Sequence, residues 1–350
     1  MTRKSHNGTK TVVVSGASAG VGRAVARRFA GEGANVVLIS RDRGRLEQAA
    51  REVEELGGKA LVCPTDVADP EAVEKAADEA EREFGPIDVW INVAMVTIFG
   101  PVGSIGPDEF KRATEVTYLG TVYGTMAALK RMKPRDRGTI VQVGSALAYR
   151  SIPLQSAYCG AKHAIIGFTD SLRSELIHDK SRVKLTVVHL PAVNTPQFNW
   201  ARNKLPMRMQ PVPPIYEPEV PAEMIHYAAH HPRREFWVGW PTWQAIIGQK
   251  LAPGLLDHYL AKAAYSGQMT SQKEIRRADN LYEPVRGAYE ARGRFEREAR
   301  SRSSQVYLSE RPALAAAAAA MPLVAFSAGI CAYVMLRNRG RAPATRSMGW

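Results

Sequence analysis

A tyrosine and a lysine one helical turn apart are the residues of this sequence best suited to proton transfer. Tyr158 and Lys162 are spaced i and i+4, which places both side chains on one face of a helix. A free phenol titrates near pH 10, so a phenol that acts as a base at neutral pH needs its pKa lowered by about 3 units, or about 4 kcal/mol. A nearby ammonium supplies part of that shift. Ser145, at the end of an apolar run, could hold a substrate oxygen.

Closely spaced glycines near the N-terminus indicate a phosphate-binding loop. They lie between an apolar run, Thr11–Ser15, and a periodic segment, Gly20–Gly31. Glycine lets the backbone turn tightly and approach a pyrophosphate, whose charge is favoured by the N-terminus of the following helix. We expect a dinucleotide to bind this loop through Gly16, Ser18, Gly20, Val21 and Gly22.

The residues that follow the second apolar run, Asn35–Ser40, bear on the choice between NADP and NAD. An acidic side chain here accepts hydrogen bonds from the ribose hydroxyls of NAD. Arg41 comes first in this chain, and a planar cation suits the 2′-phosphate of NADP. Asp42 follows directly, so NAD stays open as the less favoured cofactor. The sequence predicts NADP(H).

Apolar runs alternate with helical patterns over the first 240 residues or so, and these elements must position the reactive side chains. The predicted strands are Thr11–Ser15, Asn35–Ser40, Ala60–Pro64, Ile87–Val93, Thr139–Gly144, Val183–Leu190 and Glu235–Gly239. The predicted helices are Gly20–Gly31, Arg45–Leu56, Glu71–Phe84, Asp108–Met132 and Gln155–Ile177. Continuous apolar strands between amphipathic helices predict an α/β fold, a Rossmann-type doubly wound sheet of seven parallel strands.

The chain of 350 residues is long enough for one large domain with an appendage. We expect a disordered N-terminus over 1–9 and a cofactor-binding and catalytic domain over 10–250. Residues 194–221 are rich in Pro, Arg and Met and predict a long irregular excursion that forms a lid or a pocket wall, or else a floppy insertion. The polar stretch 268–311 predicts a linker, within a C-terminal extension over 251–311.

The segment 312–336 has no charged residue and predicts a single membrane-spanning helix. A helix needs about 20 apolar residues to cross a hydrocarbon core of about 30 Å. Alanine makes up ten of these twenty-five residues, so an Ala-rich soluble helix is the alternative. Arginines flank both sides and give no orientation. We expect membrane association through the C-terminus, with the catalytic domain in the cytoplasm.

Other composition features favour no further kind of site. The net charge of +13 is scattered, so nucleic-acid binding is not expected. Three cysteines lie far apart, without the spacing of a disulfide framework or a thiolate metal site. His226 and His230 share a helix face with His231 adjacent, but no carboxylate partner is evident, and we expect no metal.

Taken together, these motifs resemble the short-chain dehydrogenase/reductase family, in its compact branch, over roughly Lys10 to Trp243. The resemblance rests on the glycine loop, Asp66-Val67 after the third strand, Ser145, and the Tyr158–Lys162 pair. It implies an NADP(H)-dependent oxidoreductase that acts on an alcohol or carbonyl substrate. Ser145, Tyr158 and Lys162 would then be catalytic.

The resemblance also assigns further cofactor contacts. Asp66 and the adjacent Val67 would lie near the adenine, Asn92 near the adenosine ribose, and Lys162 would also hold the nicotinamide ribose. The loop Pro191–Thr195 resembles the family's loop after strand six, so Val193 and Thr195 would contact the nicotinamide carboxamide. The family further implies a homo-oligomer built through the helices 108–132 and 155–177.

Two positions depart from the family pattern. Met95 replaces a glycine after strand four, and Thr117 replaces the helix asparagine that completes a proton relay. These two residues favour an alternative, a cofactor-binding sensor without turnover. A membrane-tethered interaction protein is a second alternative. A real membrane anchor would favour a lipophilic substrate.

Overall fold

The computed structural model describes residues 9–275, 277–287 and 289–311. A seven-stranded sheet runs in the order β12-β7-β6-β4-β1-β2-β3, with every neighbouring pair parallel. Its strands are β1 (Thr11–Ser15), β2 (Asn35–Ser40), β3 (Lys59–Pro64), β4 (Ile87–Asn92), β6 (Thr139–Ser145), β7 (Lys184–Leu190) and β12 (Glu235–Trp237). The predicted doubly wound parallel sheet is confirmed.

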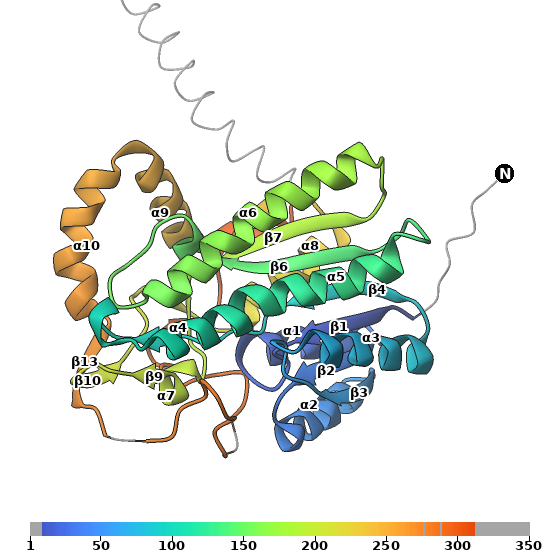
Figure 1. The fold of residues 1–350 in the computed structure, drawn as a ribbon, viewed down its shortest axis with the longest axis horizontal. Helices are drawn as coiled ribbons and strands as arrows, with labels where there is room; N and C mark the ends of the chain where they lie inside the picture. The colour runs from blue at the N-terminus through green and yellow to red at the C-terminus, as the bar shows by residue number, and fades with distance from the viewer. Residues whose placement is uncertain (1–8, 276, 288, 312–350) are drawn as a thin grey trace, which may run out of the picture. The chain divides into compact units, whose positions relative to one another are not determined.

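Helices cover both faces of this sheet (Figure 1). One layer holds α3, α5 and α6, and the other holds α1, α2 and α8. Their bounds are α1 (Gly20–Ala30), α2 (Arg43–Glu55), α3 (Pro70–Phe84), α5 (Gly120–Met132), α6 (Ser156–His178) and α8 (Glu219–His230). Because both faces are covered, the central strands are mainly apolar, as in Val12, Val13 and Val14 of β1, which have no exposed surface.

The predicted helix 108–132 is two helices joined by a π-helical turn. The turn, η2 (Glu115–Leu119), lies between α4 (Pro107–Thr114) and α5. Thr117 is fully buried within it, and its hydroxyl bonds the backbone of Val96. A single π-helical turn changes the spacing of apolar residues very little, so the sequence pattern over 108–132 is that of one continuous helix.

Short elements gather beyond the carboxyl ends of the strands, where Figure 1 places α7, α9, α10 and the β10–β13 pair. The sheet order reverses between β1 and β4, and open α/β sheets bind ligands at this edge. The elements are β5 (Ile98–Phe99), η1 (Val102–Ser104), η3 (Ala146–Ala148), β8 (Ala192–Val193), α7 (Gln197–Trp200), β9 (Arg202–Asn203), β10 (Met207–Met209), β11 (Ile215–Tyr216), α9 (Gly239–Leu251), α10 (Pro253–Gly267), β13 (Met269–Lys273) and β14 (Ala299–Arg300).

The stretch 268–303 makes more contacts than its linker-like composition suggests. β13 pairs with β10, and β14 pairs with β11. Between them, residues 277–287 and 289–298, which we name the C-terminal strap, run along the ligand-binding edge. Its backbone carbonyl oxygens accept hydrogen bonds from Gly20, Arg23 and Arg41, and its apolar side chains Leu281 and Phe295 are buried.

The chain divides into two compact units, the second of which begins at Ser304. Its described part is α11 (Ser304–Ser309) and the two residues that follow. The predicted membrane helix over 312–336 lies outside the described residues. Within the described part of the chain, no helix combines the length and the apolar character that a bilayer crossing requires.

Candidate active site

A cavity of about 410 Å³ opens at the carboxyl ends of the strands. The glycine loop and the ends of β2, β6 and β7 form part of its wall, together with α6. All but one of the residues predicted for the site line it: Gly16, Ser18, Gly20, Val21, Gly22, Arg41, Asp66, Val67, Ser145, Tyr158, Lys162, Val193 and Thr195. The fold therefore brings together side chains from distant parts of the sequence.

The glycine loop has a backbone that only glycine accommodates at two of its positions. Gly16 has a φ of +72°, and a Cβ there would lie 2.9 Å from Cα of Ala94. A Cβ on Gly22 would lie 2.2 Å from the carbonyl oxygen of Gly16. The loop thus packs tightly against the end of β4 and turns directly into α1. This leaves its backbone exposed to the cavity at the helix N-terminus, where anions bind.

The Ser145, Tyr158 and Lys162 side chains meet on one wall of the cavity. Ser145 ends β6, and Tyr158 lies in the first turn of α6, close enough to the Ser145 hydroxyl for the serine to lower the pKa of the phenol. Lys162 is buried, and its Nζ lies 5.6 Å from the centre of the Tyr158 ring. Nζ also donates to the carbonyl oxygen of Val143 at 2.7 Å, which fixes the ammonium beneath the ring.

Burial shifts the pKa values of both titratable members of this group. It raises the pKa of Tyr158 to about 12, against a smaller lowering by the hydrogen bond with Ser145. It also lowers the pKa of Lys162 to about 8. Both shifts favour the neutral form, as expected in a cavity wall of low polarity. At neutral pH the phenol holds its proton.

A buried polar chain lies behind Ser145 and was not predicted from the sequence. Ring atom Nδ1 of His189 is 3.2 Å from the carbonyl oxygen of Ser145, and Nε2 is 3.0 Å from Glu235. The Tyr149 hydroxyl donates to the same carboxylate at 2.7 Å. Burial raises the pKa of Glu235, but hydrogen bonds led by that from His189 outweigh it and hold the pKa at about 2. This chain fixes the backbone that carries the serine.

Two cations, one just after β2 and one in the first turn of α2, line the cavity. Arg41 donates to the carbonyl oxygens of Asn280 and Tyr282 in the C-terminal strap, at 2.6 and 2.5 Å. Arg45, which the sequence did not single out, also lines the cavity. Asp42 accepts the backbone N–H of Arg45 at 2.9 Å as the N-cap of α2. Asp42, the residue that left NAD as the less favoured cofactor, thus caps α2 and forms an ion pair with Arg45.

Asn92 is the one predicted cofactor contact that does not line the cavity. Its amide oxygen accepts from the Trp90 indole at 2.9 Å, and its amide nitrogen donates to Thr125 and Gln142. The side chain is buried in the interior, and its polar atoms are engaged there. The structure therefore does not support a contact between this side chain and the ribose.

The two departures from the family pattern have different surroundings. Met95 lines the cavity. Thr117 instead donates to the carbonyl oxygen of Val96 at 3.0 Å and accepts from its N–H at 3.1 Å. The Thr117 hydroxyl proton is therefore donated to a backbone carbonyl oxygen and does not point toward Lys162.

The C-terminal strap and the residues around α7, α9 and α10 complete the cavity. The N–H of Gly20 donates to the carbonyl oxygen of Glu290 at 3.1 Å, and Arg23 donates to that of Tyr289 at 2.8 Å. Around α7, α9 and α10 the cavity wall is mainly apolar. It comprises Phe198, Trp200, Pro211, Val212, Pro213, Pro241, Ala245, Leu260 and Ala264.

This fold, with a glycine loop and a Ser–Tyr–Lys group at the carboxyl ends of a parallel sheet, matches a known enzyme class. The family model described as short chain dehydrogenase matches residues 10–205. The chain belongs to the short-chain dehydrogenase family. It is therefore an oxidoreductase of alcohol and carbonyl groups that uses a nicotinamide cofactor.

Individual relatives extend this likeness beyond the sheet. The oxidoreductase YxnA of Bacillus subtilis is 34% identical over 91% of this chain and 90% of its own length. The 3-dehydrosphinganine reductase of Danio rerio is 34% identical over 53% of this chain and 57% of its own. Dehydrogenase/reductase SDR family member 7B of Rattus norvegicus is 35% identical over 55% and 60%. The likeness to YxnA thus includes most of the C-terminal extension.

Proposed function

We propose that this chain is an NADP(H)-dependent carbonyl reductase or alcohol dehydrogenase whose proton donor and acceptor is Tyr158. The substrate oxygen accepts hydrogen bonds from the hydroxyls of Ser145 and Tyr158. NADP(H), when bound, supplies or takes up the hydride. During reduction the phenol gives its proton to that oxygen, and the Lys162 ammonium stabilises the phenolate. The observation that carries the proposal is the cavity wall on which these three side chains meet.

Replacement of the phenol tests this role. We expect Tyr158→Phe to lower kcat/KM for NADPH-dependent carbonyl reduction by at least about 100-fold, since positioned acid–base groups contribute that much or more. Tyr259→Phe is the matched control, because Tyr259 is exposed on α10. The measurement is NADPH oxidation against a panel of carbonyl compounds. Unchanged turnover in Tyr158→Phe would remove the proposed role.

The proposed cofactor preference rests on the two cations between β2 and the first turn of α2. Arg41 and Arg45 both line the cavity, and Asp42 is engaged as a helix cap. A guanidinium pairs well with a phosphate, so these two residues would hold the 2′-phosphate of NADP(H). NAD is the less favoured cofactor.

Substitution of Arg41 tests the proposed preference for NADP(H) over NAD(H). We expect Arg41→Ala to weaken NADPH binding by about tenfold or more, the loss of one charge-assisted hydrogen-bonding group. NADH binding should change little. Fluorescence titration of both cofactors against wild type and variant measures this, and a wild type that prefers NADH contradicts the proposal.

The apolar wall favours a lipophilic carbonyl or alcohol as substrate. Proline, leucine, valine and alanine side chains from 211–213, α9 and α10 supply little hydrogen bonding. Each buried CH₂ of a substrate contributes about 0.8 kcal/mol, so kcat/KM should rise with alkyl chain length in a homologous series. One relative is named as a reductase of 3-dehydrosphinganine, which supports testing ketones first.

A cofactor-binding sensor without turnover is the second candidate. It is favoured by Thr117, whose hydroxyl is bonded to Val96 and would not relay a proton to Lys162. Tight NADPH binding without oxidation by any carbonyl on the panel would identify the sensor. Turnover that is lost in Tyr158→Phe would identify the enzyme.

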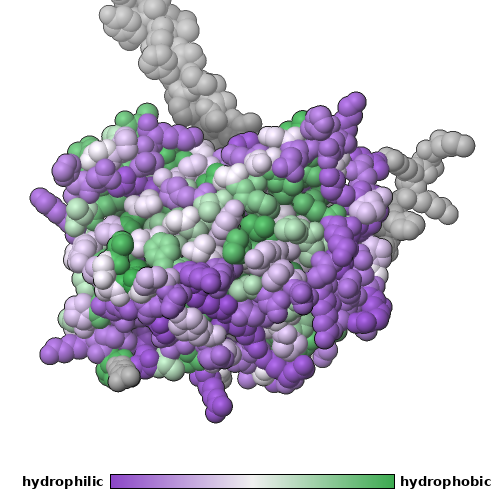
Figure 2. All heavy atoms as spheres, in the orientation of Figure 1, coloured by the Kyte–Doolittle hydropathy of each residue, from purple (hydrophilic) through white to green (hydrophobic). Residues whose placement is uncertain are grey.

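Assembly and localisation are part of the proposal. The face of α5 and α6 shows apolar residues among hydrophilic ones (Figure 2). Met126 of α5 and Ile177 of α6 are 59% and 72% exposed. Such a face suits a homo-oligomer, which light scattering would detect. We further propose that 312–336 anchors the chain to a membrane, with the catalytic domain in the cytoplasm.

A further inference from the structure

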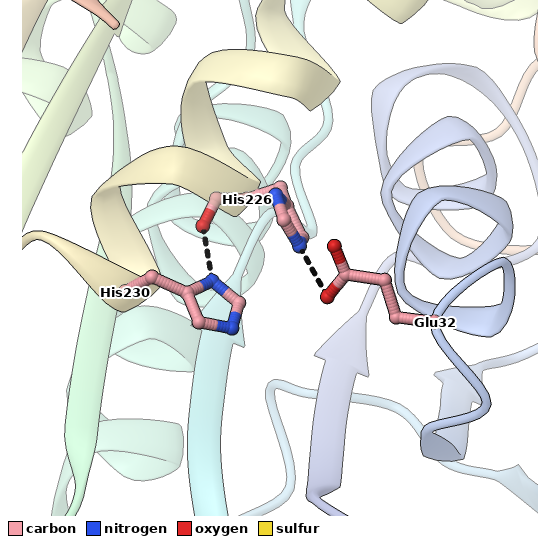
Figure 3. Close-up of side chains that lie close together, drawn as sticks. All are labelled: Glu32, His226 and His230. Atoms are coloured by element: carbon pink, nitrogen blue, oxygen red, sulfur yellow. Dashed lines mark hydrogen bonds and ion pairs between the residues drawn. The ribbon is translucent and has the colours of Figure 1, made fainter.

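Two histidines and a glutamate converge between α8 and the turn after α1 (Figure 3), and none of the three lines the cavity. His226 and His230 lie one turn apart on α8, and Glu32 lies in the turn after α1. Their ligating atoms all lie within 4.8 Å of one another. Glu32 is 194 residues from His226, which is why the sequence showed two histidines without a carboxylate.

From this geometry we propose a zinc site formed by Glu32, His226 and His230. Nε2 of His226 and a carboxylate oxygen of Glu32 are already 2.9 Å apart. A Zn²⁺ ion bound to both atoms would replace the hydrogen of that bond and would move the two atoms slightly apart, to the roughly 3.3 Å that two tetrahedral bonds of about 2.0 Å require. Two imidazole nitrogens and one carboxylate oxygen suit Zn²⁺, and the remaining tetrahedral position would hold water.

The surroundings orient each of the three side chains. Nδ1 of His230 is 2.9 Å from the carbonyl oxygen of His226, so it carries the hydrogen and leaves the lone pair of Nε2 free. Arg28 donates to the other carboxylate oxygen of Glu32 at 3.0 Å. Hydrogen bonds of this kind to the remote atoms of ligands are usual at metal sites.

The histidine rings are also held in place by packing. Both lie against Phe29 of α1, with ring centres 4.8 and 6.0 Å from it. A bound ion would tie α8 to α1, the helix whose N-terminus ends the glycine loop.

Equilibrium dialysis of the full, untagged chain against Zn²⁺ after EDTA treatment tests the site. We expect about one zinc per chain in the wild type. His230→Ala and Glu32→Gln should weaken binding by about 100-fold or more, since loss of even an outer hydrogen bond costs 10–100-fold. His231→Ala is the matched control and should bind like the wild type, because His231 is exposed and outside the group of three.

Two further measurements keep the result interpretable if a variant is destabilised. Zinc should raise the Tm of the wild type and of His231→Ala but not of the two ligand variants, since only a site in the folded state stabilises it. Co²⁺ in place of zinc should give the strong visible bands of a tetrahedral site. No binding by the wild type, equal binding in His230→Ala, or weak octahedral bands would overturn the proposal. None of these readouts depends on catalysis.

Discussion

At the scale of single residues, burial keeps the Tyr158 phenol protonated beside Lys162, so the pair is suited to giving a proton rather than taking one. With a phenol pKa of about 12 the phenol is protonated at neutral pH, while an amine pKa of about 8 leaves most of the ammonium charged. The charged amine beneath the ring then favours the phenolate as the proton leaves. This protonation state suits the reductive direction of the proposed reaction.

The pH dependence of reduction follows from the lowered pKa of Lys162. Below about pH 8 the ammonium is charged and supports proton transfer, and above that pH it becomes neutral. We expect kcat/KM for carbonyl reduction to be flat at neutral pH and to fall as the pH rises through about 8. Lys162→Arg keeps a charge at higher pH and should move the fall upward. An identical profile in that variant would contradict the role of the amine.

At the scale of elements, the π-helical turn η2 shows how one side chain can fix a local irregularity. Thr117 bonds both the N–H and the carbonyl oxygen of Val96 and so ties the turn to the segment after β4. That segment lines the cavity through Met95 and Val96. In this chain Thr117 therefore shapes the cavity wall through the backbone, without facing the cavity itself.

Removal of the Thr117 hydroxyl tests this structural role. Thr117→Val keeps the shape but leaves the buried Val96 N–H without its partner, which costs about 1–3 kcal/mol. We expect a loss of that size in the free energy of unfolding and only a small change in kcat. Thr114→Val, at the nearby and more exposed end of α4, is the control and should change stability little. Denaturant unfolding and a kcat measurement decide between these outcomes.

The sequence predicted the elements that have strong local patterns. The seven strands are mainly apolar runs with nearly the predicted bounds, because a strand covered on both faces leaves few polar positions. Ser145, Tyr158 and Lys162 were found because one strand end and one helix turn carry them. The His189–Glu235 chain and the strap contacts could not be found, because each joins residues that lie far apart in the sequence. The strap contacts of Arg41 also use backbone carbonyl oxygens, which every residue type carries.

At the scale of the whole molecule, the chain combines a sheet domain with a C-terminal region that returns to the binding edge. Residues 1–303 form one unit, so the strap belongs to the same compact body as the glycine loop. The family match ends at residue 205, and the elements after it supply α8, the last strand, β12, and much of the apolar wall. Substrate choice thus depends on the less family-specific part of the chain.

Truncation before Pro312 tests the proposed anchor. We expect the full chain to sediment with membranes and the truncated chain to stay in the supernatant, because a span of about 20 apolar residues is what holds a protein in a bilayer. Reduction of a small water-soluble ketone should be equal in both. Quantitative immunoblotting of the two fractions gives the answer, and equal sedimentation of both chains would refute the anchor.

The strap contacts of Gly20 and Arg41 have a consequence for the kinetics of coenzyme exchange. Both groups donate to strap carbonyl oxygens, and the phosphates of a dinucleotide would be acceptors for the same donors. When the coenzyme binds, its phosphate oxygens then replace the strap carbonyl oxygens as acceptors. This replacement requires the strap to detach first. In stopped-flow mixing the observed rate would level off as NADPH concentration increases, and the plateau would equal the detachment rate.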